Sequence, residues 1–489
     1  MIQPETVSRP VRLAASILNT TETEMGDLFS RKRILVRLEE DLAESSDARE
    51  TLCLAVNQCL RFCPSVGVSI PGSDGELLNE CRRIAEGIHG PGHNLGIVAS
   101  DDFSGFDAVL NIGTTVRKDM PWVTVNSGGW IARVATKDSL ADALFWEETL
   151  QNPVGALAAA CIGVGCIFFQ ILDRPVAVAA EFSLFSHLTG RPGVLTSEPS
   201  LPTSPLSLRT FLIGCGAVTN GWAYTIRRLP VTGKVWAIDR QSLSLENFGS
   251  YVAAERRWLA KPKVDLIRAL LAPDIHVVAS ADEWEFFKIH LMYGLETPQM
   301  VVNGLDNVET RHSVQRLWPE TIIDMAAGGL TSQVVVSQPV AGGLCLLGAF
   351  TRPTGEVGWA ERLSKETGLR IDRILNGATT PITEEDVESA EPEKRENLDH
   401  ARGKLICGHV TQHNLQMEGF DPDFAPAVPF VTCWSGIVGA AETLKWLMGF
   451  RHSLSLHYQK NFQSVRSRTL QMSCDPTCEC RRQIPLNAA

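Results

Sequence analysis

The chain has 489 residues, of which 44% are hydrophobic and 21% charged, and its formal net charge is −11. This length predicts two or three domains, and the composition excludes a largely disordered chain. The acidic balance argues against a nucleic-acid-binding surface, so we expect no nucleic-acid partner.

Residues 1 to about 45 form a polar lead followed by a helix of alternating charge, which is typical of a solvated helix face. The N-terminus has no apolar stretch of signal-peptide length, and the 13 cysteines are irregularly spaced. Both features favour reduced thiols and a cytoplasmic location.

Residues 50–175 follow an α/β pattern, with strands expected at 97–100, 107–113 and 122–126. The uncharged stretch 153–172 at its end is long enough to span a bilayer. Its Ala and Gly content and its flanks favour a buried helix instead, so we expect no membrane partner.

A segment rich in Pro, Ser and Thr, 190–208, is typical of a linker. The run FLIGCGAVTNG follows, and it predicts a strand at 211–213, a turn bracketed by Gly214, Gly216 and Gly221, and a helix over 222–229. Glycines before a helix N-terminus suit a phosphate group. The spacing differs from the dinucleotide-binding fingerprint, so the turn alone is a weak signal.

Further polar residues follow this turn in a fixed order. Asp239 ends the next expected strand, 234–238, where a carboxylate suits ribose hydroxyls. Asn247 and Lys263 come next, and VVNGLDNVETR places Asp306 and Arg311 after another apolar strand. Over residues 205–480 this ordered set resembles the adenylyltransferase family of ubiquitin-activating enzymes and their bacterial relatives in thiamine and molybdopterin synthesis.

The resemblance implies ATP and Mg²⁺ as cofactors. It makes Gly214 and Gly216 the phosphate loop and Asp239 the ribose ligand; Asn247 and Lys263 would contact phosphates, and Asp306 would hold the magnesium ion and act in catalysis. One position departs from the family pattern, because Ser250 stands where an arginine is expected. The candidates to replace that arginine are Arg256, Arg257 or an arginine from the first half of the chain.

The two halves of the chain share features that indicate an internal repeat. Residues 106–113 parallel 300–306 with Thr114 at the place of Asp306, and the helix at 154–169 parallels 430–447. We therefore expect an α/β protein with two Rossmann-like adenylation lobes, the first degenerate and the second active. The alternative is two unrelated α/β domains. The expected parts are an inactive lobe at 1–189, the linker 190–208, the active lobe at 209–349 and 429–489, and an insertion at 350–428.

In the family, the catalytic cysteine lies in the connection that the insertion 350–428 represents. Cys407 is the cysteine inside this region, and His409 and His413 follow it. A thioester step needs an accessible thiolate, which nearby imidazoles can favour. Cys407 is the favoured candidate; Cys433 and the absence of any catalytic cysteine are the alternatives.

The tail holds Cys474, Cys478 and Cys480, and Cys345 stands apart from them in sequence. A closed structural zinc site needs four ligands. The spacing favours free thiols over a zinc site.

The predicted function is ATP-dependent adenylation of the C-terminal glycine of a ubiquitin-like protein, thioester formation on Cys407, and transfer to a conjugating enzyme. Such a resemblance suggests a bacterial pathway, including antiviral defence, and it leaves open whether the chain forms a homodimer. One alternative is an adenylyltransferase without a cysteine step, acting on a sulfur-carrier protein, a peptide or another small carboxylate. A second is a catalytically inactive binding scaffold. A nicotinamide-dependent oxidoreductase is disfavoured, because Lys263 and the segment 306–311 have no role in hydride transfer.

Overall fold

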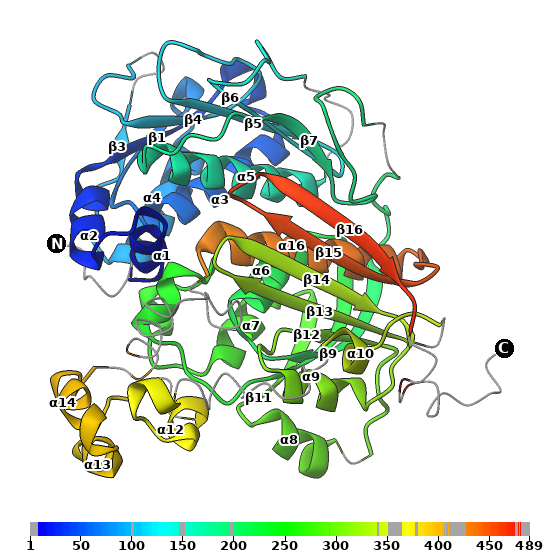
Figure 1. Cartoon of the computed structure of the whole chain (residues 1–489). Coiled ribbons are helices and arrows are strands. Elements are labelled where there is room, and N and C mark those ends of the chain that lie inside the picture. Colours follow the sequence, from blue (N-terminus) through cyan, green and yellow to red (C-terminus); the bar gives the residue numbers. More distant parts are fainter. Residues whose placement is uncertain are drawn as a thin grey trace. The chain divides into compact units, whose positions relative to one another are not determined.

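The computed structural model describes residues 8–98, 102–145, 152–195, 199–292, 294–339, 342–350, 364–376, 380–404, 406, 409, 427–474, 478 and 480. The chain divides into two compact units: Met1–Ala349 with Ala427–Ala489, and Phe350–Pro426. The larger unit contains two sheets of eight strands each (Figure 1).

The first sheet defines lobe 1 and has the order β3-β2-β1-β4-β5-β6-β7-β8. Neighbouring strands are parallel from β3 to β5 and antiparallel from β5 to β8. Its strands are β1 (Arg33–Leu38), β2 (Ser65–Ser69), β3 (Gly96–Ile97), β4 (Ala108–Ile112), β5 (Trp122–Gly128), β6 (Ile131–Thr136), β7 (Ala179–Ser183) and β8 (Thr189–Gly190).

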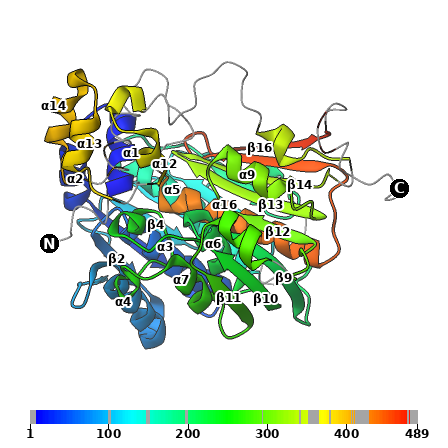
Figure 2. The same ribbon diagram turned by 90° about the horizontal axis from the view of Figure 1, so that it is seen from below.

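The second sheet defines lobe 2 and repeats this plan, with the order β11-β10-β9-β12-β13-β14-β15-β16. Figure 2 shows β11, β10, β9 and β12 side by side. Its strands are β9 (Leu206–Ile213), β10 (Val231–Ile238), β11 (Ile275–Ser280), β12 (Met300–Asn303), β13 (Thr321–Gly328), β14 (Thr331–Ser337), β15 (Ser455–Asn461) and β16 (Arg466–Met472). The same strand order in both sheets confirms the predicted α/β fold with two Rossmann-like lobes.

The strand register aligns the lobes residue by residue. Asn111 pairs with Thr124 between β4 and β5, and Asn303 pairs with Asp324 between β12 and β13. Counting on from Asn111 and Asn303 places Thr114 opposite Asp306, as the sequence comparison predicts. The β-hairpins also match, because each turns at a glycine of positive φ, Gly129 at 59° and Gly329 at 53°.

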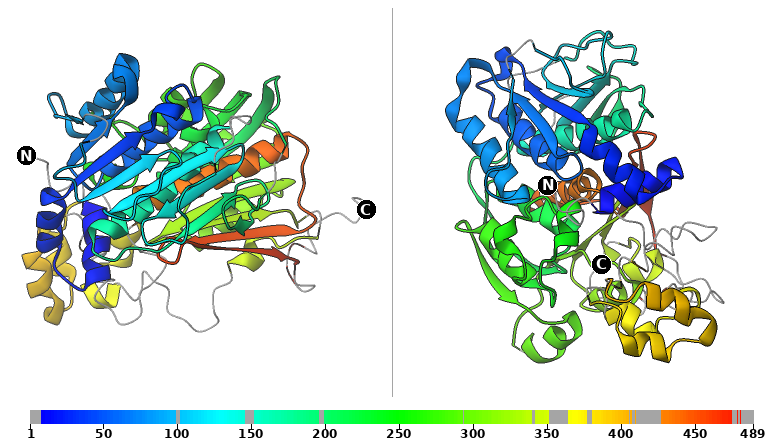
Figure 3. Two further views of the ribbon diagram at one scale, coloured as in Figure 1. Left: turned by 90° about the horizontal axis from the view of Figure 1, so that it is seen from above. Right: turned by 90° about the vertical axis from the view of Figure 1, so that its left-hand side faces the viewer.

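Helices fill the space between the two sheets of the larger unit (Figures 1 and 3). The long helices α5 (Pro153–Ile171) and α16 (Pro429–Leu447) are counterparts, each following the matched hairpin of its lobe, and they pack on each other. The other principal helices of this unit are α1 (Ser8–Leu18), α2 (Glu22–Arg31), α3 (Ser46–Leu60), α4 (Gly75–His89), α6 (Ala217–Ile226), α7 (Lys263–Leu271), α8 (Trp284–Phe286), α9 (Val308–Gln315) and α10 (Leu346–Ala349), and short turns of helix lie at Leu245–Gly249 and Phe287–Leu291.

Helix α5 is long and apolar enough to cross a membrane by length and composition alone. All residues of its most apolar window are buried inside the protein, between the first sheet and α16. A helix that is apolar on every side is typical of a core position flanked by packed elements on all faces.

Helix α6 begins at Ala217, five residues before the predicted start, so Gly221 lies inside the helix and not in the turn. A Cβ atom at Gly221 would lie 2.9 Å from Cys433 Cα on α16, and one at Gly436 would lie 2.3 Å from Trp222 N. These glycines therefore serve the close packing of α6 on α16, and Gly214 and Gly216 alone belong to the turn.

The smaller unit contains helices α12 (Ile371–Asn376), α13 (Glu384–Ser389) and α14 (Pro392–His400). Its core is a separate cluster of buried side chains, which includes Leu369, Ile382 and Leu398. Ile406 and His409 are also buried, at 1% and 6% exposure. Cys407 and His413 lie outside the described residues.

Candidate functional site

The turn between β9 and α6 lies at the carboxyl end of the second sheet, where open α/β sheets bind ligands. Gly214 has a φ of 80°, which favours glycine, and a Cβ atom there would lie 3.2 Å from the backbone of Gly304. Gly216 is the N-cap of α6, and no side chain caps that helix. A helix N-terminus with uncapped N–H groups behind a glycine turn fits an anionic group.

Asp239 and Lys263 lie beside this turn. Asp239 Oδ2 accepts a hydrogen bond from Cys215 N at 2.7 Å, and its Oδ1 accepts one from Gln241 N at 2.7 Å. Lys263 is buried and donates from Nζ to Gln241 Oε1 at 2.5 Å. The turn, the carboxylate and the ammonium group thus form one constellation, although 48 residues lie between Gly214 and Lys263 in the chain.

The charge of Lys263 is maintained despite its burial. Burial alone would lower the pKa of this ammonium, but Tyr251 and Asp239 outweigh that effect and raise the pKa. Lys263 is also the first residue of α7, where the helix dipole disfavours a cation. An ammonium group retained at such a position is suited to binding an anion.

Asn247 and Asp306 lie in the loops that follow β10 and β12, the two strands on either side of β9. Asn247 is 6% exposed, and its Oδ1 accepts a hydrogen bond from Ser244 N at 2.9 Å. Asp306 is exposed, two residues beyond Gly304, which contacts the glycine turn. Gly214, Gly216, Asp239 and Lys263 therefore lie together at one end of the second sheet, and Asn247 and Asp306 lie in loops at the same end.

Arginines from lobe 1 approach the loop that carries Asn247. Arg9 of α1 lies against Gly249, whose Cβ would be 3.5 Å from Arg9 Cβ, and its charge acts on Lys263. Arg61, at the end of α3, is fully buried and donates to three carbonyl oxygens of the loop, those of Phe248, Val252 and Ala254. Lobe 1 thus holds this loop of lobe 2 and brings a cation close to it.

The other arginine candidates are used differently. Arg257 pairs with Glu255 at 2.7 Å, and Arg256 lies 3.5 Å from the place of a Cβ at Gly90, beyond the end of α4. Neither contact is with the glycine turn. Arg9 is a first-half arginine whose charge acts on Lys263.

The matching end of lobe 1 lacks these groups. The register places Leu38, Glu40 and Ile70 opposite Gly214, Gly216 and Asp239. Glu39 takes the place that corresponds to the glycine turn. Its carboxylate accepts hydrogen bonds from Thr114 N at 2.8 Å and from Asn111 Nδ2 at 2.7 Å. Burial would raise the pKa of Glu39, but these hydrogen bonds outweigh it and lower the pKa. A carboxylate in this place excludes a phosphate by charge and by volume.

Four cysteines form a candidate metal centre elsewhere in the larger unit. The ligand atoms of Cys345, Cys474, Cys478 and Cys480 all lie within 4.8 Å of one another. A backbone hydrogen bond from Cys474 N to Gly342 O aligns the two chain segments. Four thiolates around one point suit a closed tetrahedral zinc site. The expectation that Cys345 stands apart is wrong, because antiparallel pairing brings distant segments together.

Cys433 is 0% exposed and lies within α16, against α6. A thioester step needs access to the sulfur, so this buried position disfavours the alternative to Cys407.

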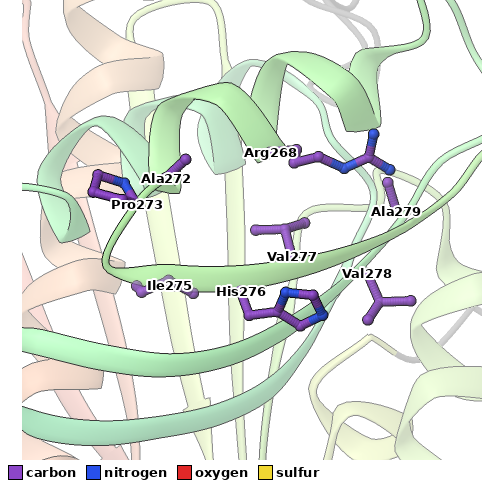
Figure 4. Close-up of a pocket in the computed structure, with 8 residues that line it drawn as sticks. All are labelled: Arg268, Ala272, Pro273, Ile275, His276, Val277, Val278 and Ala279. Carbon is purple, nitrogen blue, oxygen red and sulfur yellow. The ribbon is translucent and has the colours of Figure 1, made fainter.

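A surface cavity of about 570 Å³ lies along the edge strand β11 and α7 (Figure 4). It is lined by Arg268, Ala272, Pro273 and residues 275–279. None of the constellation residues lines it, and the chemistry of its lining is mainly apolar. We therefore place the candidate site at the glycine turn.

No family model matches this chain, and no curated protein matches it. Solved structures that resemble it include crystal structures of E. coli MccB. MccB alone has a TM-score of 0.36 at 14% identity, over 56% of this chain and 64% of that chain. MccB with MccA-N7isoASN has a TM-score of 0.36, and MccB with ATP one of 0.34, each at 14% identity over 56% of this chain and 66% of the other.

The matched part is thus less than two thirds of the length of each MccB chain. Because the identity is 14% and the TM-scores are below 0.5, the likeness is distant. The functional assignment therefore depends on the geometry of the site.

Proposed function

We propose that lobe 2 binds ATP and uses it to adenylate a carboxylate at the C-terminus of a protein or peptide. The supporting observation is the convergence of Gly214, Gly216, Asp239 and Lys263 at the carboxyl end of one sheet, in a chain whose other sheet has the same topology without these groups. The contrast between matched lobes argues that the constellation serves a ligand and not the fold.

Each residue has a role that its chemistry suits. The N–H groups at the start of α6 would hold phosphate oxygens, and Asp239 would accept from ribose hydroxyls. Asn247, Lys263 and Arg9 would surround the remaining phosphates, and Asp306 would bind Mg²⁺. ATP would supply the adenylyl group: a carboxylate oxygen of the substrate would attack the α-phosphorus, the bond from that phosphorus to the oxygen bridging the α- and β-phosphates would break, and pyrophosphate would leave with that electron pair.

The first test of this proposal is nucleotide binding. Lys263→Met should weaken binding of MgATP by about tenfold or more, because a charge-assisted contact contributes about 1.5–3 kcal/mol. Lys261→Met is the matched control, since Lys261 is exposed and lies over the ring of Trp258. Isothermal titration calorimetry measures the MgATP affinity of both variants. Equal affinity in the two variants would exclude the assigned phosphate site.

We further propose that the substrate is a ubiquitin-like protein and that Cys407 receives its C-terminal glycine. The Cys407 thiolate would attack the acyl carbon of the adenylate, AMP would leave, and the acyl group would pass to the cysteine of a conjugating enzyme. The burial of Cys433 supports Cys407 among the two candidates.

Intact mass spectrometry tests this step after incubation with MgATP and a candidate ubiquitin-like protein under non-reducing conditions. The expected result is a thiol-sensitive adduct in the wild type and its absence in Cys407→Ser. Pyrophosphate release without an adduct would instead support the simpler adenylyltransferase. If the partner binds but neither pyrophosphate nor an adduct forms, the binding-scaffold alternative is supported.

A further inference from the structure

Position 250, where the resemblance implies an arginine, is buried against α16. Ser250 is 0% exposed, and its carbonyl oxygen accepts a hydrogen bond from Thr432 Oγ1 of α16 at 2.6 Å. A long cation at this place would meet the core between the loop and α16. The charge and hydrogen bonds of an arginine therefore have to come from neighbouring residues.

The next residue, Tyr251, faces the turn. It is 4% exposed, and its hydroxyl lies 4.0 Å from the place that a Cβ would take at Gly216. Its ring centroid lies 5.3 Å from Lys263 Nζ. The phenol is thus between the start of α6 and the buried ammonium group.

The backbone of Tyr251 is firmly held. Its N–H donates to Asn247 O at 2.9 Å, and the next carbonyl, that of Val252, accepts from Arg61 at 2.7 Å. Such contacts on both sides fix the direction of the side chain. A preorganised hydroxyl next to uncapped helix N–H groups is a ready donor for an anionic oxygen.

We propose that Tyr251 is a phosphate-binding and lysine-positioning residue: its hydroxyl donates to a phosphate oxygen at Gly216, and its ring holds the Lys263 ammonium toward that oxygen. This inference depends on the proposed ATP binding. The ring acts on Lys263 through a cation–π contact, and the hydroxyl replaces one hydrogen bond that an arginine at position 250 would make. Arg9 supplies the positive charge that a phenol lacks.

The test separates the hydroxyl from the ring. Tyr251→Phe keeps the ring and should weaken MgATP binding by about tenfold, since it removes one hydrogen bond to a charged group. Adenosine, which has no phosphate, should bind Tyr251→Phe and wild type equally in competition with labelled ATP. Tyr251→Leu removes the ring as well, and it should also change the rate at which an amine reagent modifies Lys263, as followed by peptide mass spectrometry.

Tyr224→Phe is the matched control, because Tyr224 of α6 is also buried but its ring packs against Arg228, just after the helix, with 3.8 Å from Arg228 Cζ to the ring centroid. Tyr224→Phe should leave the affinities for MgATP and for adenosine unchanged. If Tyr251→Phe weakens ATP and adenosine equally, the residue is merely structural and the inference is wrong. If Tyr251→Phe binds ATP like wild type while Lys263→Met does not, the inference alone fails. If wild type itself binds no MgATP, the proposed function fails and the inference falls with it.

Discussion

Two buried lysines of this chain have opposite surroundings. Lys263 has Asp239 and Tyr251 beside it, and its pKa is raised. Lys460 of β15 has no hydrogen-bond partner at Nζ among the described residues, and burial lowers its pKa to about 7. Its Nζ lies among three aromatic rings, 3.6 Å from the centroid of Phe182, 4.9 Å from that of Trp434 and 5.5 Å from that of Phe462. The first lysine keeps its charge beside a carboxylate and a phenol, and the second is enclosed by apolar core side chains.

Lys460→Met should stabilise the protein near pH 7. In the unfolded chain the lysine keeps its proton up to about pH 10.4, whereas in the folded protein it loses the proton above about pH 7. Between these values the unfolded state binds more protons, so the stability of the wild type rises with pH. The advantage of Lys460→Met should therefore shrink from pH 7 to pH 10, as measured by urea unfolding.

Lys261→Met, on the surface, should show no such dependence. The opposite result, a wild type more stable than Lys460→Met at pH 7, would mean that the negative faces of the three rings keep the ammonium charged despite its burial.

The contact between α6 and α16 depends on glycine. Gly436→Ala would place a Cβ 2.3 Å from Trp222 N, a backbone atom that has little room to move. We expect a loss of about 1–3 kcal/mol in the free energy of unfolding, which is typical of overpacking a core. In α2, a Cβ at Gly26 meets nothing within 4 Å. Gly26→Ala should therefore raise the free energy of unfolding by about 0.5–1 kcal/mol through helix propensity. If Gly436→Ala and Gly26→Ala changed the free energy of unfolding equally, the packing argument would be wrong.

The cysteine cluster joins the chain around α10 to the segment after β16. We expect one Zn²⁺ per chain by elemental analysis, and Cys345→Ser should lose it, because a three-thiolate remainder leaves the tetrahedron open. Removal of the ion by a chelator should lower the melting temperature of the wild type. Cys166→Ser, at a buried cysteine in α5, is the control that should retain the metal. A metal-free wild type would indicate free thiols after all.

The molecule as a whole contains two lobes with the same strand order but with different residues at the carboxyl ends of their strands. Lobe 1 has Glu39 where lobe 2 has its glycine turn, but it contributes Arg61 and Arg9 to the loop of lobe 2. Under the proposed function, lobe 1 would therefore act by supporting the loop of lobe 2 that carries Asn247.

Arg61→Met tests this dependence. It leaves buried carbonyl oxygens of residues 248–254 without their donor, so we expect a loss of stability of about 2–4 kcal/mol and weaker MgATP binding. Arg133→Met is the matched control, since Arg133 is equally buried but pairs with Glu181 inside lobe 1, at 3.2 Å. Arg133→Met should lower stability without a change in the affinity of the folded protein for ATP. Unchanged affinity in both variants would contradict the supporting role of lobe 1.

Local patterns in the chain were enough to predict the two-lobed α/β fold and the place of the glycine turn. Strand periodicity, glycine positions and the residues that end parallel strands are short-range features, and the carboxyl ends of such strands always meet at one edge of a sheet. Gly214 and Asp239 directly follow such strands, β9 and β10, whereas Lys263 and Asp306 are implied by the resemblance to the adenylyltransferase family.

Other features depend on contacts between segments far apart in sequence. Tyr251 and Ser250 are neighbours in the chain, and the packing of the loop against α16 and Arg61 decides that the tyrosine faces the turn. The register of distant segments likewise brings Cys345 to the other cysteines, and helix packing assigns Gly221 to a core contact. Side-chain direction and long-range pairing are set by the free energy of the whole packed core, which no local pattern in the sequence encodes.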